Sequence, residues 1–180
     1  MRTMHMVLAL VALIGCGSDG KGADSGTSRA TSGVECDDGV CVLSGTLLED
    51  LTLTADNVYL LRGGVFIGDD QASTVLTIEP GVTIYGESST DGMLAVTRNS
   101  RIEALGTADA PIVFTSSKEV GTRARGDWGG LIINGNAPVN SCGADFEGEL
   151  CEAFGEGGTG FYGGNDPADN SGTLTYVRVE

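Results

Sequence analysis

Apolar residues recur along this chain at a fixed 18-residue interval. One series at this interval consists of Ile78, Val96, Phe114 and Ile132. Ile84 and Ile102 are separated by the same interval. A fixed period of this size predicts a chain that coils on itself, so that each turn covers the apolar side chains of the turn before. The interval therefore predicts stacked strands about 4.8 Å apart.

Short apolar segments alternate with Gly, Asn and Asp turns from Ser44 onward. They are rich in Val, Ile, Leu, Thr and aromatic residues, which suit the pleated surface of a strand. We predict strands at residues 51–53, 58–61, 65–67, 75–78, 82–85, 93–96, 101–104, 112–115, 131–133 and 174–179. A β-sandwich is the alternative, but the 18-residue interval favours an all-β, right-handed parallel β-helix over residues 44–180.

The strand pattern breaks between Asn140 and Asn170, where Gly, acidic residues and Cys are frequent. We predict a loop excursion there, stapled by a disulfide. Two close pairs of cysteines are Cys36 with Cys41 and Cys142 with Cys151. Three pairings are possible, and we expect the local one in an exported protein. Thiolate metal binding is the alternative, but neither spacing is Cys-x2-Cys.

The N-terminus has the pattern of a bacterial lipoprotein signal sequence. Its apolar run, residues 6–14, is far shorter than the about 20 residues that span a bilayer. The run ends in Leu-Ile-Gly-Cys at Cys16, which resembles a lipobox. We expect residues 1–15 to be a signal peptide, Cys16 to carry lipid, and residues 16–43 to form a flexible tether with a small disulfide loop. An ordinary secretory signal is the alternative. Because no aspartate follows Cys16, we expect the outer membrane and the cell surface as the location.

The charge of the chain excludes several classes of function. Its formal net charge is −15, which repels nucleic acid and anionic lipid headgroups and attracts divalent cations. Its only histidine, His5, lies in the predicted signal peptide. A mature chain without histidine excludes Ser-His-Asp and Cys-His catalysis and the common zinc-enzyme ligand sets.

Three segments carry a family likeness. They are IEPGVTI at 78–84, GDWGGLIING at 126–135 and YGGNDPADNSGTLTYVRVE at 162–180. Together they resemble a family of secreted bacterial β-helix lipoproteins, and the likeness covers residues 60–180. The resemblance implies a right-handed parallel β-helix and no particular activity. Members of that family continue beyond this point, so we expect a β-helix truncated at its C-terminal end.

Five residues are candidates for ligand binding: Arg123, Arg125, Trp128, Phe161 and Tyr162. An exposed Trp128 could stack on a sugar ring, although a tryptophan between glycines more often packs at a corner. Lys118 lies near the two arginines, and β-helix polysaccharide lyases use Arg or Lys as a base. The motif at Gly68-Asp69-Asp70 is a weak likeness to the clustered aspartates of polygalacturonase-like hydrolases. Solvated loop charges are the simpler interpretation of the charged residues in this set.

An oxygen-rich segment makes calcium the one candidate cofactor. Asp166, Asp169 and Asn170 lie in it, and calcium takes six to eight oxygen ligands. Other acidic residues nearby in sequence are Asp145, Glu147, Glu149, Glu152 and Glu156. The alternative is an acidic loop whose side chains cap turns.

These observations predict a lipid-anchored cell-envelope protein that acts as a non-catalytic surface-binding or adhesion module. Its expected partners are the membrane, through the lipid, and extracellular polysaccharide, but not nucleic acid. A polysaccharide lyase or glycoside hydrolase is the alternative, and a structural envelope protein is a further one, because one fold hosts many functions.

Overall fold

The computed structural model describes residues 33–142 and 150–180, so the predicted signal peptide and Cys16 lie outside the described residues. The regular secondary structure of the described part consists of strands and two single-turn 3-10 segments. The strands are β1 Gly33–Asp37, β2 Val40–Leu47, β3 Leu51–Leu53, β4 Val58–Ile67, β5 Val75–Ile78, β6 Thr83–Gly86, β7 Met93–Val96, β8 Arg101–Leu105, β9 Ile112–Ser116, β10 Gly130–Ile133, β11 Cys151–Phe154, β12 Phe161–Gly164, β13 Gly172–Thr175 and β14 Val177–Val179. The 3-10 segments are η1 Asn140–Cys142 and η2 Glu156–Gly158. None of the described helices is long and apolar enough to span a membrane.

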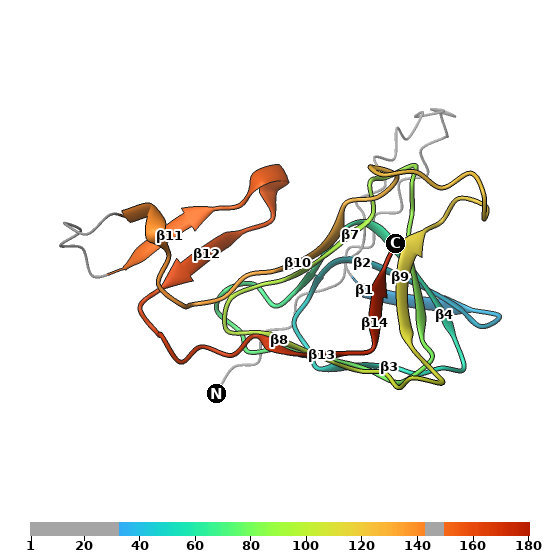
Figure 1. The fold of residues 1–180 in the computed structure, drawn as a ribbon, viewed down its shortest axis with the longest axis horizontal. Helices are drawn as coiled ribbons and strands as arrows, with labels where there is room; N and C mark the ends of the chain where they lie inside the picture. The colour runs from blue at the N-terminus through green and yellow to red at the C-terminus, as the bar shows by residue number, and fades with distance from the viewer. Residues whose placement is uncertain (1–32, 143–149) are drawn as a thin grey trace, which may run out of the picture.

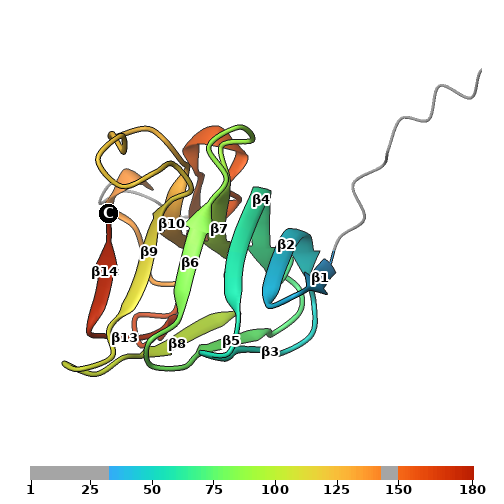
Figure 2. The same ribbon diagram turned by 90° about the vertical axis from the view of Figure 1, so that its right-hand side faces the viewer.

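Most strands pair in parallel, in three ladders that form three sides of the molecule (Figure 2). The first ladder runs β2–β4–β6–β9–β14, and the third runs β3–β5–β8–β13. The second ladder joins the latter half of β4 to β7 and then to β10. Each pass of the chain adds a strand to each ladder: β6, β7 and β8 form one pass, and β9, β10 and β13 form the next.

Strand β4 turns a corner between two ladders. Its first half pairs with β6 and its second half with β7. Between the halves Gly63 has φ +61°, a left-handed conformation that glycine adopts at little cost. The two strands predicted at 58–61 and 65–67 are therefore one strand with a bend.

The interior is filled by alternate side chains from all three ladders. In β4 the buried positions are Tyr59, Leu61, Val65 and Ile67, which follow the period of two on each side of the bend. Phe114 of β9 is the largest of the fully buried side chains. The described chain therefore has one continuous apolar core between the ladders.

Among the described parallel pairs, 18 residues is the stacking interval only between β2 and the first half of β4, where Val40 pairs with Val58. The stacking partners predicted from the apolar series were wrong: Ile84 stacks on Phe114, and Leu76 stacks on Ile102, and these partners are farther apart in sequence. The interval instead joins different ladders, because Ile78 lies in β5 and Val96 in β7. All three ladders bury aliphatic residues, so a repeat of buried positions does not show which strands are neighbours.

Two hairpins lie in segments that were predicted to lack strands. The β1–β2 hairpin turns at Asp38-Gly39, both with positive φ, and Cys36 is bonded to Cys41 directly across it. An Asp-Gly turn is a strong hairpin signal, and it occurs within the predicted tether at 16–43. The β11–β12 hairpin lies within the predicted excursion, where Cys142 is bonded to Cys151. Both disulfides follow the local pairing.

The ends of the predicted strands are mostly correct. Strands β3, β5 and β7 have the predicted bounds. The strand predicted at 174–179 is divided at Tyr176, whose φ is +48°. The chain turns there from the third ladder to the first, so the one predicted strand is two strands in different ladders.

Candidate functional site

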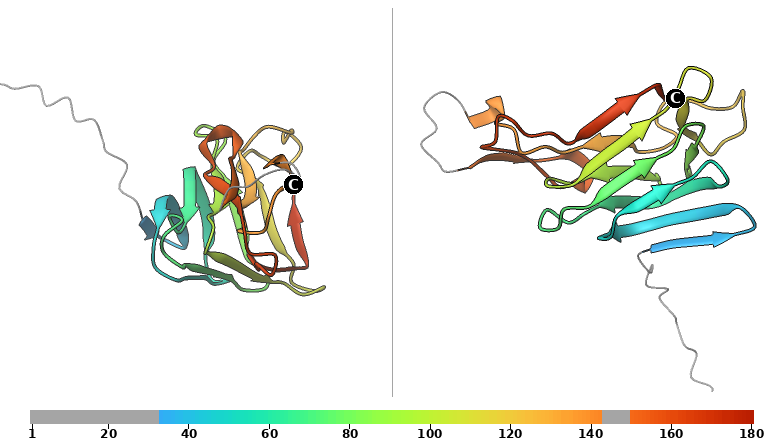
Figure 3. Two further views of the ribbon diagram at one scale, coloured as in Figure 1. Left: turned by 90° about the vertical axis from the view of Figure 1, so that its left-hand side faces the viewer. Right: turned by 90° about the horizontal axis from the view of Figure 1, so that it is seen from below.

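The β11–β12 hairpin projects from the side of the molecule that β7 and β10 form (Figures 1 and 3). We call residues 151–164 the arm. Phe154 and Phe161 are opposite one another in it, with ring centroids 5.0 Å apart and edge-to-face geometry. The tip is tied to the body by Asn134, whose Nδ2 donates to the Thr159 carbonyl at 2.7 Å. The arm is therefore held at its base by the Cys142–Cys151 disulfide and at its tip by a buried hydrogen bond.

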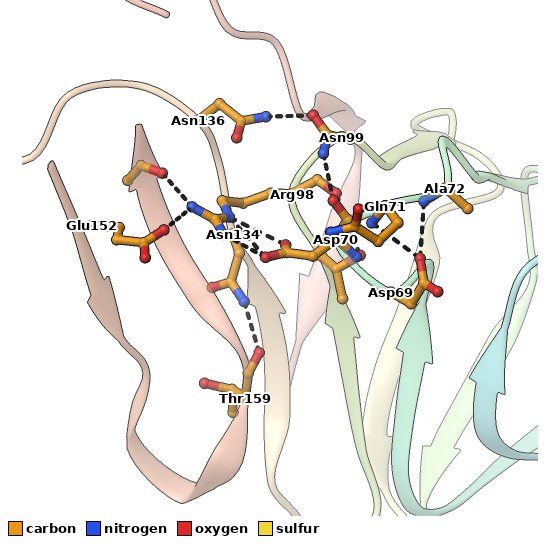
Figure 4. Close-up of polar contacts among 12 residues, drawn as sticks. Asp69, Asp70, Gln71, Ala72, Arg98, Asn99, Asn134, Asn136, Glu152 and Thr159 are labelled. Atoms are coloured by element: carbon orange, nitrogen blue, oxygen red, sulfur yellow. Dashed lines mark hydrogen bonds and ion pairs between the residues drawn. The ribbon is translucent and has the colours of Figure 1, made fainter. Parts of the chain in front are cut away.

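Arg98 joins three separate segments of the chain (Figure 4). Its Nε donates to Asp70 at 3.0 Å, and its Nη1 donates to Glu152 at 2.7 Å and to the Gly163 carbonyl at 3.1 Å. The guanidinium also lies 5.6 Å from the centroid of the Phe161 ring. The side chain of Arg98 is only 12% exposed. This arginine fixes the arm against the β4–β5 and β7–β8 connections.

Hydrogen bonds in this region shift the pKa values of Arg98 and of the nearby Asp69. The hydrogen bond to Asp70, followed by that to Glu152, raises the pKa of Arg98, so the guanidinium stays protonated. Asp69 accepts from the backbone N–H groups of Ala72 and Gln71, which lower its pKa. The two aspartates of the Gly-Asp-Asp motif therefore stabilise a turn and an ion pair.

Two of the predicted arginines and Trp128 come together in one pocket. Arg123, Arg125, Trp128 and Glu180 line a cavity of about 410 Å³, which we call the basic pocket. Arg123 Nη1 donates to Thr115 Oγ1 at 2.8 Å, and its guanidinium lies 5.9 Å from the Tyr85 ring centroid. The guanidinium is thus oriented before any ligand arrives.

Trp128 both packs and lines the basic pocket. Its ring system lies against Gly86, where an added Cβ would be 2.5 Å from the Trp128 Cβ. Its Nε1 donates to the Glu180 carbonyl at 3.0 Å. Partial burial against the core agrees with the packed-corner interpretation, while the rest of the indole stays available to the cavity.

Arg125 differs from the other cations of residues 33–142 and 150–180. Each of the others has a carboxylate oxygen within 4.0 Å: Arg62, Arg98, Arg101, Lys118, Arg123 and Arg178. Arg125 is exposed at the rim of the basic pocket and has no such partner in the described chain. In a protein of net charge −15, an unpaired guanidinium is an available site for an anion.

Asp127 is buried beneath the same loop and is 7% exposed. It accepts from Lys118 Nζ at 2.6 Å, from the Ala124 N–H at 2.8 Å and from Ser116 Oγ at 3.1 Å. The bond from Lys118 is the main cause of its lowered pKa. Lys118 is therefore engaged in an ion pair that holds the loop carrying Arg123 and Arg125.

We expect the stability of the protein to depend on pH through Asp127. Because its pKa is lower in the folded than in the unfolded state, where it is near 3.9, it stabilises the fold above that value. This stabilisation is lost as the pH falls through the folded-state pKa. Urea unfolding at pH 7 and pH 3 should show a gap between wild type and Asp127→Asn that is wide at pH 7 and narrow at pH 3. An equal gap at both values would contradict the ion pair with Lys118.

The other predicted site residues lie elsewhere. Phe161 and Tyr162 belong to the arm, not to the basic pocket. Asp166 and Asn170 accept from backbone N–H groups two residues later, and Asp169 accepts from the Asn136 N–H at 3.0 Å. The contacts of Asp166 and Asn170 cap turns, whereas that of Asp169 joins segments 33 residues apart in sequence. In the described ranges no three His, Cys, Asp or Glu side chains gather in a group that could hold a metal ion, and Asp145, Glu147 and Glu149 lie outside those ranges.

Arg98 was not among the residues predicted from the sequence for this region. Its partners Asp70 and Glu152 are 28 and 54 residues away in sequence. No local signal distinguishes such an arginine from a solvated one, because the partners are brought together only by the fold.

Comparison with known proteins agrees with this architecture. A family model described as a pectate-lyase-like β-helix domain matches residues 45–180. No curated protein and no solved structure matches the chain. The matched region includes strands of all three parallel ladders, the basic pocket and the arm. The chain therefore belongs to the family of pectate-lyase-like β-helix domains.

Proposed function

We propose that this protein is a lipid-anchored, cell-surface module that binds acidic polysaccharide without cleaving it. The observation that carries the proposal is the guanidinium of Arg125 at the rim of the basic pocket, which has no carboxylate partner among the described residues. A guanidinium pairs with a carboxylate through two parallel hydrogen bonds, and the Trp128 ring offers an apolar face to a sugar. Arg123 adds a second cation that Thr115 orients. A uronate residue matches this combination of groups.

Charge supports a local and selective site. The net charge of −15 repels a polyanion from most of the surface. The anionic sugar is therefore favoured only where a cation lacks an internal partner. Surface attraction of this kind is weakened by salt, so binding should fall as ionic strength rises.

The family description supports a role with polysaccharide, and it also keeps a lyase as the alternative. A lyase needs a basic side chain that can accept a proton from the sugar. The pKa of Arg98 is raised by its carboxylate partners, and Lys118 is bonded to Asp127. These ion pairs argue against Arg98 and Lys118 as the base of a lyase.

The anchored arrangement is part of the proposal. The lipobox-like segment that ends at Cys16 supports attachment of lipid, and several acyl chains together hold a protein stably at a membrane. We also propose that the three ladders wind as a right-handed coil, because parallel crossovers are right-handed in nearly all proteins. This arrangement would present the basic pocket to ligands outside the cell.

Replacing Arg125 by alanine should weaken binding to polygalacturonate by about tenfold or more, since a hydrogen bond to a charged group contributes about 1.5–3 kcal/mol. Affinity is measured by retention on immobilised polygalacturonate, with neutral dextran as the comparison ligand. The matched control is Arg101→Ala, which removes the same charge from an exposed pair with Glu103 on the third ladder. Equal retention of both variants would contradict the site, and shortened polygalacturonate would favour the lyase.

A further inference from the structure

Two cavities lie between the outer face of the second ladder and the tip of the arm. The larger is about 700 Å³ and has Gly64, Met93 and Ile132 on the ladder side and Glu156 and Thr159 on the arm side. The smaller is about 280 Å³ and has Phe66 on the ladder side and Gly160 and Phe161 on the arm side. We call the two together the arm groove. Figure 1 shows the arm standing away from β7 and β10, with its tip turned back towards them.

The floor of the arm groove is apolar. Gly64 is opposite Met93, and Phe66 is opposite Ala95, which is in turn opposite Ile132. The Phe66 ring lies over Gly64, where an added Cβ would be 2.8 Å from Cε2. These residues alternate with the inward-facing Val65, Leu94 and Val96, so they form the outward row of the ladder, in which Ala95 is fully covered. A row of this kind on an exposed sheet would normally be polar.

The rim of the arm groove carries unpaired carboxylates. Asp69 borders the smaller cavity, and Asp91 and Glu156 border the larger one. None of the three has a Lys or Arg nitrogen within 4.0 Å among the described residues. Asp69 is held ionised by two backbone N–H groups, which lower its pKa. The groove therefore combines an apolar floor with uncompensated negative charge.

The arm groove is formed before any ligand binds. Arg98 fixes the arm near its base, and the Asn134–Thr159 hydrogen bond fixes its tip. Both walls are already ordered, so binding a ligand does not require a loop of the protein to become ordered. The loss of conformational entropy on binding is therefore smaller.

We propose that the arm groove binds a basic polypeptide segment in which Lys or Arg residues alternate with apolar ones. A lysine or arginine has an apolar stem and a charged end. The stem can lie on Phe66, Met93 and Ile132 while the charged end reaches Asp69, Asp91 or Glu156. An acidic polysaccharide is repelled by the same carboxylates. This site is separate from the basic pocket, so it does not depend on the proposed polysaccharide function.

The test uses the purified chain and a fluorescein-labelled pentapeptide, Lys-Leu-Lys-Leu-Lys with blocked ends, followed by fluorescence anisotropy. The triple variant Asp69→Asn, Asp91→Asn and Glu156→Gln should bind the peptide at least about tenfold more weakly than wild type. Asparagine at Asp69 keeps the oxygen that caps the turn, and asparagine at Asp91 tolerates its φ of +51°.

The matched control is Asp56→Asn, Glu79→Gln and Asp109→Asn. These residues are exposed in turns away from the arm, and the charge change is the same. It should change peptide affinity by less than about twofold. Equal weakening in both triple variants would overturn the proposal, because it would show attraction by net charge alone. Absence of binding to wild type, or equal binding of Glu-Leu-Glu-Leu-Glu or a neutral oligosaccharide, would overturn it as well. Polygalacturonate retention should be preserved in the arm-groove variant, which separates this result from any failure of the basic pocket.

Discussion

Replacing Phe114 by alanine is expected to lower the free energy of unfolding by about 4 kcal/mol, within the range for a buried phenylalanine. Phe114 is 0% exposed and lies in β9 between β6 and β14. Its ring fills the interior between the ladders. Because the flanking strands are held in register by backbone hydrogen bonds, they cannot close onto the space that alanine would leave. The lost apolar contacts and the remaining cavity therefore both contribute.

Equilibrium unfolding in urea measures this effect. The matched control is Val113→Ala in the same strand, because Val113 alternates with Phe114 and is only half-buried. The control should cost about 1 kcal/mol or less. If the two substitutions had equal effects, the assignment of inward and outward side chains in the first ladder would be wrong.

Replacing Arg98 by alanine is expected to cost about 3 kcal/mol and to release the arm. Removing one member of a buried ion pair leaves the other charge without compensation, which costs about 3–5 kcal/mol. We expect the lower end of that range because Asp70 and Glu152 keep 21% and 34% exposure of their side chains. Asp70, Glu152 and the Gly163 carbonyl would all lose a donor.

Urea unfolding gives the stability, and amide hydrogen exchange in the arm shows its release. The control is Arg101→Ala, whose partner Glu103 is two residues away on the surface; it should cost about 0–1 kcal/mol. Adding Asp70→Ala to Arg98→Ala should recover part of the loss, because one fewer unpaired carboxylate would remain. Unchanged exchange in the arm of Arg98→Ala would contradict its role as the connection between the arm and the body.

The region of the candidate site shows where sequence reasoning succeeded and where it did not. Arg123, Arg125 and Trp128 are close in sequence, and the fold brings them into one pocket. Phe161 was named with them, but it lies in the arm, where its ring contacts Arg98. Nearness in sequence was informative only where a single loop carries all of the residues.

The amino-acid sequence by itself determined where most of the strands are and which side chains they bury. Short segments of aliphatic residues predict β3, β5 and β7 with their bounds. Successive side chains of a strand point to opposite faces whichever strand it pairs with, so the pattern is visible in the sequence alone. Only the tertiary structure decided which strands are neighbours, which carboxylates Arg98 meets and which arginine has no carboxylate partner among the described residues. The pairing of strands such as β6 and β9 depends on the lengths of the connections between them. Ion pairs across 28 and 54 residues form only when separate segments pack together. Local periodicity contains no information about contacts of that range.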